Sequence, residues 1–414
     1  MNEILDYCQR AKKAAKSCSM LSNVTKNKIL QSLIERIESN KESIISENKK
    51  DLEIARNKGI NEALIQRLEI NEKVFNEMIN GIKTIIELEN PIGEIIESRI
   101  IQKTLKLSKV RVPLGVVIII YESRPNVTID VSAICIKSGN AVILKGGSDA
   151  LHSNLALYNC IFEAFQENNI DDSIVQLIEK PGHETVNELL KQDEFIDAVI
   201  PRGGKNLIRN VVENSKIPVI KHFEGICNIY VDKKADIEKA VRIIINAKVQ
   251  KAGTCNAVEN LIINKEIAER FLPVIKEEFL KNDVEIRGCD ETREIIDAKA
   301  ATEDDFKTEY LAKIISIKVV KDIDEAISFI DKYGSGHSDA IVTEDKLNAA
   351  KFLKQVDSAA VYHNASTRFT DGGQFGMGCE IGISTQKLHA RGPMGLKEMT
   401  SYKYLITGDG EVRE

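Results

Sequence analysis

The chain has 414 residues, of which 43% are hydrophobic and 29% are charged, a balance that excludes a disordered chain and indicates two or three globular domains. Its 57 basic and 63 acidic residues give a formal net charge of −6 without any basic block, which argues against nucleic-acid binding. The longest apolar run, from Val116 to Tyr121, is far shorter than the ~20 residues that span a bilayer. Since the N-terminus also lacks a secretory pattern, we expect a cytoplasmic protein.

The N-terminal part of the chain is predicted to be helical. Up to about residue 90, apolar residues recur every three or four positions with charged residues between them. From Ile95 to Pro113 the pattern changes, and apolar residues alternate with lysine, arginine, serine and threonine. This alternation predicts a β-hairpin.

Strands and helices then alternate in two series. In the first series we expect strands at 116–120, 141–144, 174–178, 198–200 and 219–220, with helices at 126–138, 153–167, 186–190 and 207–214. In the second we expect strands at 229–231, 258–263, 314–320, 340–342 and 359–361, with helices at 237–249, 266–281, 323–332 and 346–355. Continuous apolar strands that alternate with helices are typical of parallel βαβ units, so the fold class is α/β.

Two turns that follow strands of the first series have the composition of phosphate-binding turns. They read Leu144-Lys145-Gly146-Gly147-Ser148-Asp149 and Ile200-Pro201-Arg202-Gly203-Gly204-Lys205. Paired glycines let backbone N–H groups approach an anion, and a following helix adds partial positive charge. Two such turns in one domain favour a dinucleotide, although a lone Gly-Gly pair is also common in tight turns. No GxGxxG motif follows any of the expected strands, so a standard Rossmann site is not supported.

Cys255 is the candidate nucleophile among the eight cysteines. The cysteines show no CxxC pair and no zinc-ligand spacing, so we expect no metal site and mostly buried, inert thiols. Cys255 differs because it follows Ala252-Gly253-Thr254, between a helical segment and an apolar β-branched run. These small neighbours would let a substrate carbonyl approach the thiol. A non-catalytic thiol that serves as a redox switch or a binding handle is the alternative.

A long loop, rich in glycine and polar residues, occupies positions 365–395. Loops of this length are usually functional. At its start, Ser366 and Arg368 bring a hydroxyl and a guanidinium together, a combination that suits a carboxylate or a phosphate.

These features together resemble the aldehyde dehydrogenase superfamily and, within it, the family of γ-glutamyl phosphate reductases. The superfamily resemblance rests on the hairpin and on Pro113-Leu114-Gly115-Val116-Val117, Ala141-Val142-Ile143-Leu144-Lys145 and Gly253-Thr254-Cys255. The narrower resemblance rests on longer motifs, which are Tyr121-Glu122-Ser123-Arg124-Pro125-Asn126-Val127-Thr128, Tyr333-Gly334-Ser335-Gly336-His337-Ser338-Asp339, Asn364-Ala365-Ser366-Thr367-Arg368-Phe369 and Glu380-Ile381-Gly382-Ile383-Ser384-Thr385-Gln386-Lys387-Leu388-His389-Ala390-Arg391-Gly392-Pro393. The chain departs from the family signature at Phe329, where histidine is usual.

The resemblance implies a chemistry for Cys255. Its thiolate would attack L-glutamate 5-phosphate (γ-glutamyl phosphate) and form a thioester, which hydride from NADPH would reduce to L-glutamate 5-semialdehyde in the second step of proline biosynthesis. The backbone N–H of Cys255 and the side chain of Asn126 are the implied oxyanion donors. Glu224 is shifted from the position of the superfamily's water-activating glutamate, which favours a reductase over a hydrolytic oxidase. An oxidative or CoA-acylating aldehyde dehydrogenase on the same fold is the second possibility.

The resemblance also implies binding residues. Lys145 matches the lysine that meets the adenosine ribose or its phosphate, and Ser148 stands where NAD-preferring members often carry glutamate, which favours NADPH. The remaining implied cofactor residues are Gly146, Gly147, Arg202, Gly203, Gly204 and Glu309, and the implied substrate residues are Arg124, His222, Ser366 and Arg368.

The implied architecture comprises two Rossmann-like parallel α/β domains and a β-hairpin oligomerisation element. Residues 1–94 and 114–226 would form the NADPH-binding domain, and residues 227–390 the catalytic domain that carries Cys255. Residues 95–113 and 391–414 would form the hairpin and the C-terminal tail, through which a homo-oligomer is expected. Functional coupling to glutamate 5-kinase is expected because that enzyme makes the acyl phosphate.

Overall fold

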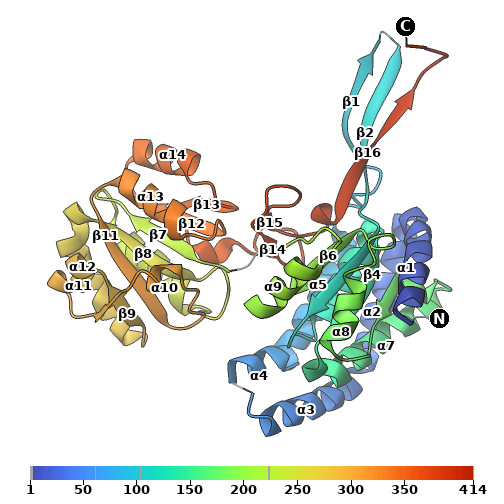
Figure 1. Ribbon diagram of the computed structural model, residues 1–414, viewed down its shortest axis with the longest axis horizontal. Coiled ribbons are helices and arrows are strands. Elements are labelled where there is room, and N and C mark those ends of the chain that lie inside the picture. Colours follow the sequence, from blue (N-terminus) through green and yellow to red (C-terminus); the bar gives the residue numbers. More distant parts are fainter. Residues whose placement is uncertain (1–2, 61, 103, 222–223, 414) are drawn as a thin grey trace. The chain divides into compact units, whose positions relative to one another are not determined.

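The computed structural model describes residues 3–60, 62–102, 104–221 and 224–413 (Figure 1). The chain divides into two compact units. The first comprises Met1–Lys221, Gly376–Gly382 and Met394–Glu414, and the second comprises His222–Phe375 and Ile383–Pro393.

The N-terminal helices form as their apolar periodicity predicts. They are α1 (Glu3–Met20), α2 (Asn23–Ser39), α3 (Lys41–Asn57), α4 (Glu62–Leu68) and α5 (Glu72–Glu87). The side chains of Ser22 and Asn71 accept hydrogen bonds from the first turns of α2 and α5, which satisfies N–H groups that have no partner within the helix.

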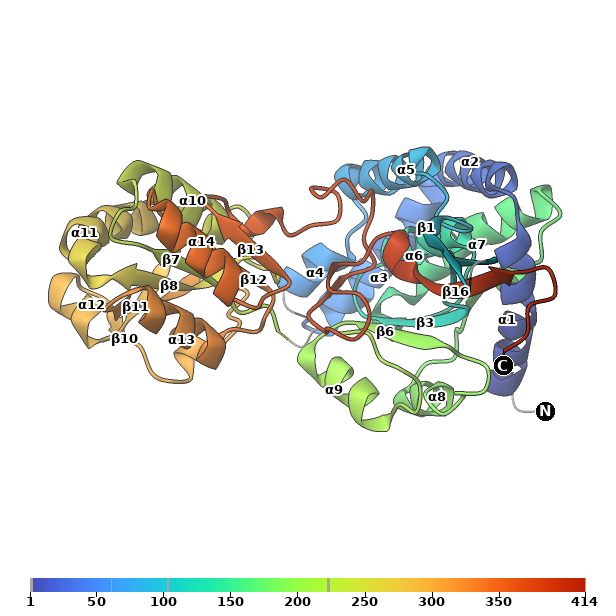
Figure 2. The ribbon, with the colours of Figure 1, turned by 90° about the horizontal axis from the view of Figure 1, so that it is seen from above.

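A parallel four-stranded sheet forms the centre of the first unit, in the order β5-β4-β3-β6. Its strands are β3 (Val116–Tyr121), β4 (Ala141–Gly146), β5 (Val175–Leu177) and β6 (Ala198–Arg202), and the connecting helices are α6 (Val127–Ser138), α7 (Leu151–Glu167), α8 (His183–Leu189) and α9 (Lys205–Asn214). Val116, Ile118 and Ile120 pack with α1, α8 and α9 on one face. On the other face Tyr121 reaches the Thr128 hydroxyl of α6, so helices cover both sides (Figure 2).

The predicted strand at 219–220 is wrong. Val219 forms only an isolated bridge with Val199. Pro218, the preceding residue, has no N–H to continue a ladder, which limits pairing to this one position.

The predicted hairpin is confirmed and gains a third strand. β1 (Ile95–Ile101) pairs with β2 (Leu105–Pro113), and β16 (Thr400–Thr407) pairs antiparallel with the other edge of β2. Figure 1 shows these strands projecting from the rest of the first unit. Ile100 and Ile406 are 60% and 59% exposed, so this small sheet presents apolar side chains that its own unit does not cover.

A parallel seven-stranded sheet forms the second unit, in the order β10-β9-β11-β8-β7-β12-β13. The strands are β7 (Cys227–Val231), β8 (Val258–Asn264), β9 (Glu285–Gly288), β10 (Lys299–Ala300), β11 (Ile314–Val320), β12 (Ser338–Val342) and β13 (Ala360–His363). The helices are α10 (Ile237–Val249), α11 (Lys265–Lys281), α12 (Asp290–Ile295), α13 (Ile323–Tyr333) and α14 (Lys346–Gln355).

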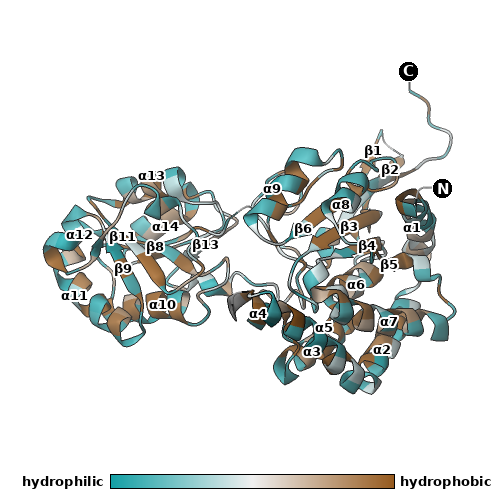
Figure 3. Ribbon diagram, turned by 60° about the horizontal axis from the view of Figure 1, so that its bottom comes forward, coloured by the Kyte–Doolittle hydropathy of each residue, from teal (hydrophilic) through white to brown (hydrophobic). Residues whose placement is uncertain are grey.

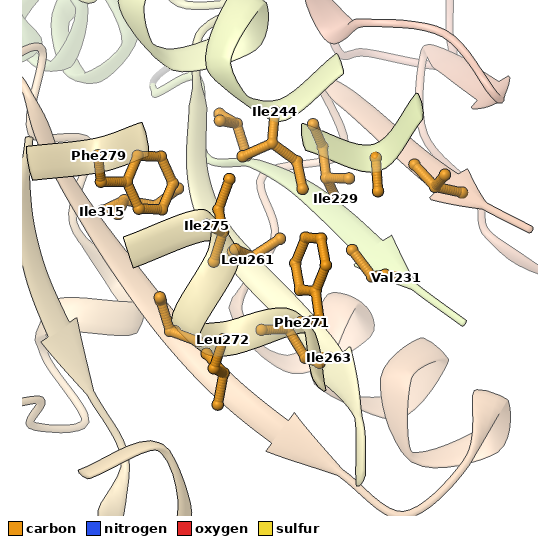
Figure 4. Close-up of a cluster of buried hydrophobic side chains, with 14 of the residues drawn as sticks. Ile229, Val231, Ile244, Leu261, Ile263, Phe271, Leu272, Ile275, Phe279 and Ile315 are labelled. Atoms are coloured by element: carbon orange, nitrogen blue, oxygen red, sulfur yellow. The ribbon is translucent and has the colours of Figure 1, made fainter. Parts of the chain in front are cut away.

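Successive side chains along the buried strands of the second unit point to opposite faces of the sheet, and each face has its own hydrophobic core. Ile229 and Val231 of β7 pack against α10 and α11, where Phe271 and Phe279 fill the space over the sheet (Figure 4). Tyr230, between them, points to the opposite face and packs with α13 and α14. Figure 3 shows the same distribution, with apolar strands inside and polar helix faces outside. Among the helices of the described residues, none combines the length and apolar character that crossing a membrane requires.

We predict that Asp51 is a major stability determinant of the first unit. Its buried carboxylate accepts hydrogen bonds from the Ser153 N–H at 2.8 Å, the Ser153 hydroxyl at 2.6 Å and the His152 N–H at 3.2 Å at the start of α7. Asp51→Ala leaves these donors unsatisfied and should lower the free energy of unfolding by about 2–4 kcal/mol. Asn71→Ala, at the exposed cap of α5, should cost about 1 kcal/mol. Urea unfolding followed by circular dichroism measures both, and equal losses would contradict this account.

Candidate functional site

Cys255 lies in the turn between α10 and β8 of the second unit, where its side chain is half-buried. The turn closes with a hydrogen bond from the Ala257 N–H to the Thr254 carbonyl at 3.0 Å. The backbone of Gly225 packs directly against it. A Cβ on Gly225 would lie 2.0 Å from the carbonyl oxygen and 2.6 Å from the Cα of Cys255, so no other residue fits this position without displacing the turn.

Asn256 fixes the turn from the inside. Its Oδ1 accepts hydrogen bonds from the Thr254 hydroxyl, at 2.9 Å, and from the Arg368 guanidinium. Its Nδ2 donates to the Thr370 carbonyl at 2.9 Å, and its own carbonyl accepts from the Thr367 hydroxyl at 2.7 Å. One buried side chain thereby ties the cysteine turn to the start of the long polar loop.

Arg368 places a cation beside the thiol. Its Nε donates to Gln250 Oε1 at 2.8 Å, and its guanidinium also reaches Asn256. Burial lowers the pKa of Arg368, whereas the nearby Asp371 and Cys255 act in the opposite direction. Because the guanidinium lies within electrostatic reach of Cys255, it favours anionic species at this point.

Cys227, the first residue of β7, supports the cysteine turn through a hydrogen bond. Its Sγ donates to the Cys255 carbonyl at 3.2 Å. Burial raises the pKa of Cys227 well above its ordinary value, so the group stays a neutral thiol donor. We assign it a structural role in orienting the backbone of Cys255.

Glu309 lies near the base of this turn. Its half-buried carboxylate is close enough to Cys227 and to the buried Glu259 to help raise the pKa of each. The implied ribose-binding residue thus belongs to the same unit as the candidate nucleophile.

The two glycine-rich turns of the first unit flank the end of β3. Lys145 and Gly146 end β4, and the exposed Ser148 opens the following short helix. Burial lowers the pKa of Lys145, whose ammonium donates to the Gly146 carbonyl at 3.0 Å. The Gly147 N–H donates to the Tyr121 carbonyl at 2.8 Å, which joins this turn to β3.

Arg202, Gly203 and Gly204 form the second turn, between β6 and α9. From β3 the chain adds β4 and β5 on one side and then returns to add β6 on the other side, so the strand order changes direction between β3 and β6. Ligands of open parallel sheets bind at the carboxyl ends of the strands at such a point. Glu122, which follows β3, accepts the Gly204 N–H at 2.9 Å, and its own N–H donates to the Arg202 carbonyl at 3.1 Å. Glu122 therefore sets the shape of this turn.

Asn126 is the N-cap residue of α6 in the first unit, and its side-chain amide is hydrogen-bonded there. Its Nδ2 donates to Asp130 Oδ2 at 2.8 Å. Burial raises the pKa of Asp130 to about 6, although the Asn126 hydrogen bond and the charge of Arg202 act in the opposite direction. The implied oxyanion role of Asn126 stays a prediction.

The implied substrate residues fall in different places. Arg368 and Ser366 lie beside the cysteine turn, where the Ser366 hydroxyl accepts the Arg368 N–H at 3.3 Å. Arg124 belongs to the segment between β3 and α6 of the first unit. His222 lies outside the described residues.

Sequence reasoning missed Asn256, Glu122, Asp130 and Gly225. Two of them carried a usable signal: Asn256 follows the candidate nucleophile in a turn, where asparagine commonly bonds to nearby backbone, and Glu122 is a charged residue directly after a buried strand. The burial of Asp130 and the close approach at Gly225 have no local sequence signal, because both depend on distant segments.

Comparisons with known proteins bear on the family and the fold of the chain. The sequence model of the aldehyde dehydrogenase family matches residues 2–293 and 294–405. The chain is 51% identical to a γ-glutamyl phosphate reductase of Caldanaerobacter subterraneus subsp. tengcongensis, over 100% of both chains. It is 49% identical to the crystal structure of γ-glutamyl phosphate reductase from Thermotoga maritima, with a TM-score of 0.97 over 100% of each chain. A glyceraldehyde-3-phosphate dehydrogenase from Methanocaldococcus jannaschii, complexed with NADP, shares the fold at 19% identity and a TM-score of 0.71, over 98% of this chain and 94% of that chain.

We predict that Asp130 makes stability depend on pH. Its pKa rises from 3.8 to about 6 on folding, so the folded state binds more protons in that interval and its stability falls as pH rises through it. Asp130→Asn removes this loss, so its melting temperature relative to the wild type should increase from pH 4 to pH 7. Asp193→Asn, at an exposed position of the same unit, is the control. A difference between wild type and Asp130→Asn that does not change with pH would contradict the prediction.

Proposed function

Because the chain belongs to the aldehyde dehydrogenase family, we propose that it reduces L-glutamate 5-phosphate to L-glutamate 5-semialdehyde and phosphate, with NADPH as reductant. The observation that carries this proposal is the full-length identity of 51% to a γ-glutamyl phosphate reductase, with Cys255 held in a turn beside a cation. The reaction is the second step of proline biosynthesis from glutamate.

Cys255 would act as the nucleophile. Its thiolate attacks the acyl carbon of the substrate, the S–C bond forms, and the C–O bond to phosphate breaks, with phosphate leaving with the electron pair. Arg368, beside the thiol, is suited to the negative charge of the acyl phosphate. We propose that Ser366, Arg124 and His222 contribute to binding the phosphate and the α-carboxylate.

The backbone N–H of Cys255 is our proposed donor to the oxyanion, with Asn126 as the second candidate. Asn256 and Cys227 support this role because their hydrogen bonds hold the backbone of the Cys255 turn in place. A preorganised backbone donor stabilises developing charge without any reorganisation during the reaction.

The first unit has a donor set that fits a nicotinamide dinucleotide. Arg202 Nε is buried and has no hydrogen-bond partner in the described part of the chain, and it lies at the reversal point of the sheet. With Gly203 and Gly204 it suits a pyrophosphate, while Lys145, Gly146 and Gly147 suit the adenosine side. Glu309 would hold the nicotinamide ribose. When bound, the reduced dinucleotide supplies the hydride that releases the acyl group as aldehyde.

We propose NADPH rather than NADH because of Ser148. This exposed residue stands where NAD-preferring relatives often carry glutamate, and a hydroxyl does not repel a 2′-phosphate. The NADP bound by the Methanocaldococcus jannaschii protein, which shares the fold, is consistent with this choice.

We further propose that the chain forms a homo-oligomer through β1, β2 and β16. Their exposed apolar residues, including Ile95, Ile100 and Ile406, favour burial against a second copy. Coupling to glutamate 5-kinase is proposed because acyl phosphates hydrolyse readily. A cytoplasmic location stays a prediction.

The test is a coupled assay with glutamate 5-kinase, ATP and glutamate. The wild type should oxidise NADPH faster than NADH, and Cys255→Ala should lose at least about 10³-fold in kcat with an unchanged melting temperature. Ser148→Glu should lower kcat/KM for NADPH by about tenfold while sparing NADH. Retained turnover in Cys255→Ala would refute the nucleophile, and equal effects of Ser148→Glu on both cofactors would refute the selectivity assignment.

A further inference from the structure

A fully buried ion pair joins the two ends of the cysteine turn. The ammonium of Lys248, in the last turn of α10, lies 2.6 Å from Oε2 of Glu259, the second residue of β8. Both side chains have 0% exposure. Charges buried to this extent pay a large desolvation penalty, and apolar residues of similar volume often stabilise a fold equally well. The position of the pair therefore needs an explanation other than stability.

The second oxygen of Glu259 reaches a different segment. Its Oε1 accepts a hydrogen bond from the Leu311 N–H at 3.4 Å. Leu311 has a φ of 51°, a left-handed conformation that is strained for a branched side chain. Its carbonyl oxygen lies 3.8 Å from the place that a Cβ on Gly253 would take, two residues before Cys255. Glu259 thus holds a strained backbone against the cysteine turn.

Leu311 also follows Glu309 by two residues. The hydrogen bond from Leu311 to Glu259 therefore restrains the segment that carries the Glu309 carboxylate. Glu309 and Cys227 are the titratable groups that face the ion pair, and both influence the pKa of Lys248. Burial raises the pKa of Glu259 to about 7, a cost that Lys248 partly offsets. Nucleophile, ion pair and Glu309 therefore form one connected cluster within the second unit.

We propose that Glu259 is a positioning residue. Through Lys248 it fixes both ends of the turn that carries Cys255, and through Leu311 it fixes the segment that carries Glu309 against the same turn. The arrangement sets the thiol and the ribose-binding carboxylate in one geometry. This inference rests on the proposed function for the roles of Cys255 and Glu309, but the contacts of Glu259 with Lys248 and Leu311 are independent of substrate.

Two double variants separate positioning from stability. Lys248→Met with Glu259→Gln removes both charges and keeps an acceptor oxygen for Leu311. Lys248→Met with Glu259→Met removes the charges and the acceptor at similar side-chain volume. Melting temperatures show whether each is folded. The rate at which iodoacetamide alkylates Cys255 reports the position and surroundings of its thiol, and it does not require catalytic activity. Cys289 of the same unit serves as the internal standard.

We expect the Gln variant, which loses the ion pair across the turn but keeps the hydrogen bond to Leu311, to be alkylated about threefold more slowly at Cys255 and to keep KM for NADPH within about twofold of the wild type. The Met variant should be alkylated about tenfold more slowly at Cys255, because the thiol leaves its cationic neighbour, and should raise KM for NADPH by about tenfold. Wild-type rates in the Met variant, or equal losses in both variants, would overturn the proposal. Absent reductase activity in the wild type would refute the proposed function instead, and the alkylation comparison would still decide the positioning role.

Discussion

The candidate active site depends on one constraint, which is that three neighbouring parallel strands have their amino ends side by side. β11, β8 and β7 are neighbours in the sheet of the second unit, and parallel strands begin at the same edge. The segments before them carry Leu311, Cys255 and Gly225, so the sheet forces these segments together. The thiol consequently lies at the amino ends of its strands, whereas the glycine-rich turns of the first unit lie at the carboxyl ends of β4 and β6.

Buried polar groups then convert proximity into a defined geometry. Asn256 bonds both to its own turn and to the loop at Thr367–Thr370, Cys227 holds the Cys255 carbonyl, and Gly225 packs tightly against the turn. A side chain held in this way loses little entropy on reaching the transition state, and its neighbouring N–H groups are already aimed. The arrangement suits an acyl transfer in which phosphate leaves first, since no water need be activated.

Much of the fold was predictable from sequence because periodicity reports burial. The helices at 237–249 and 346–355 and the strand at 314–320 match the structure at both ends. β9, β10 and β16 were missed, since the first two are short and partly exposed and the third lies far from its partner β2 in the chain. The turns that carry Cys255 and the paired glycines could be placed between their elements because the signal of a turn is local. The burial that raises the pKa of Asp130 and the contacts of Glu259 with Lys248 and Leu311 could not be found in this way, because they arise only when the chain folds.

The central claim is that Cys255 carries the acyl group between phosphate release and reduction. The most direct measurement is mass spectrometry of the protein after incubation with glutamate 5-kinase, ATP and glutamate, in the absence of any nicotinamide dinucleotide. Without a hydride source the thioester should accumulate, and the peptide containing Cys255 should gain the mass of one glutamyl group that hydroxylamine removes. A glutamyl adduct on another residue, or none on Cys255 while phosphate is released by the enzyme, would contradict the account.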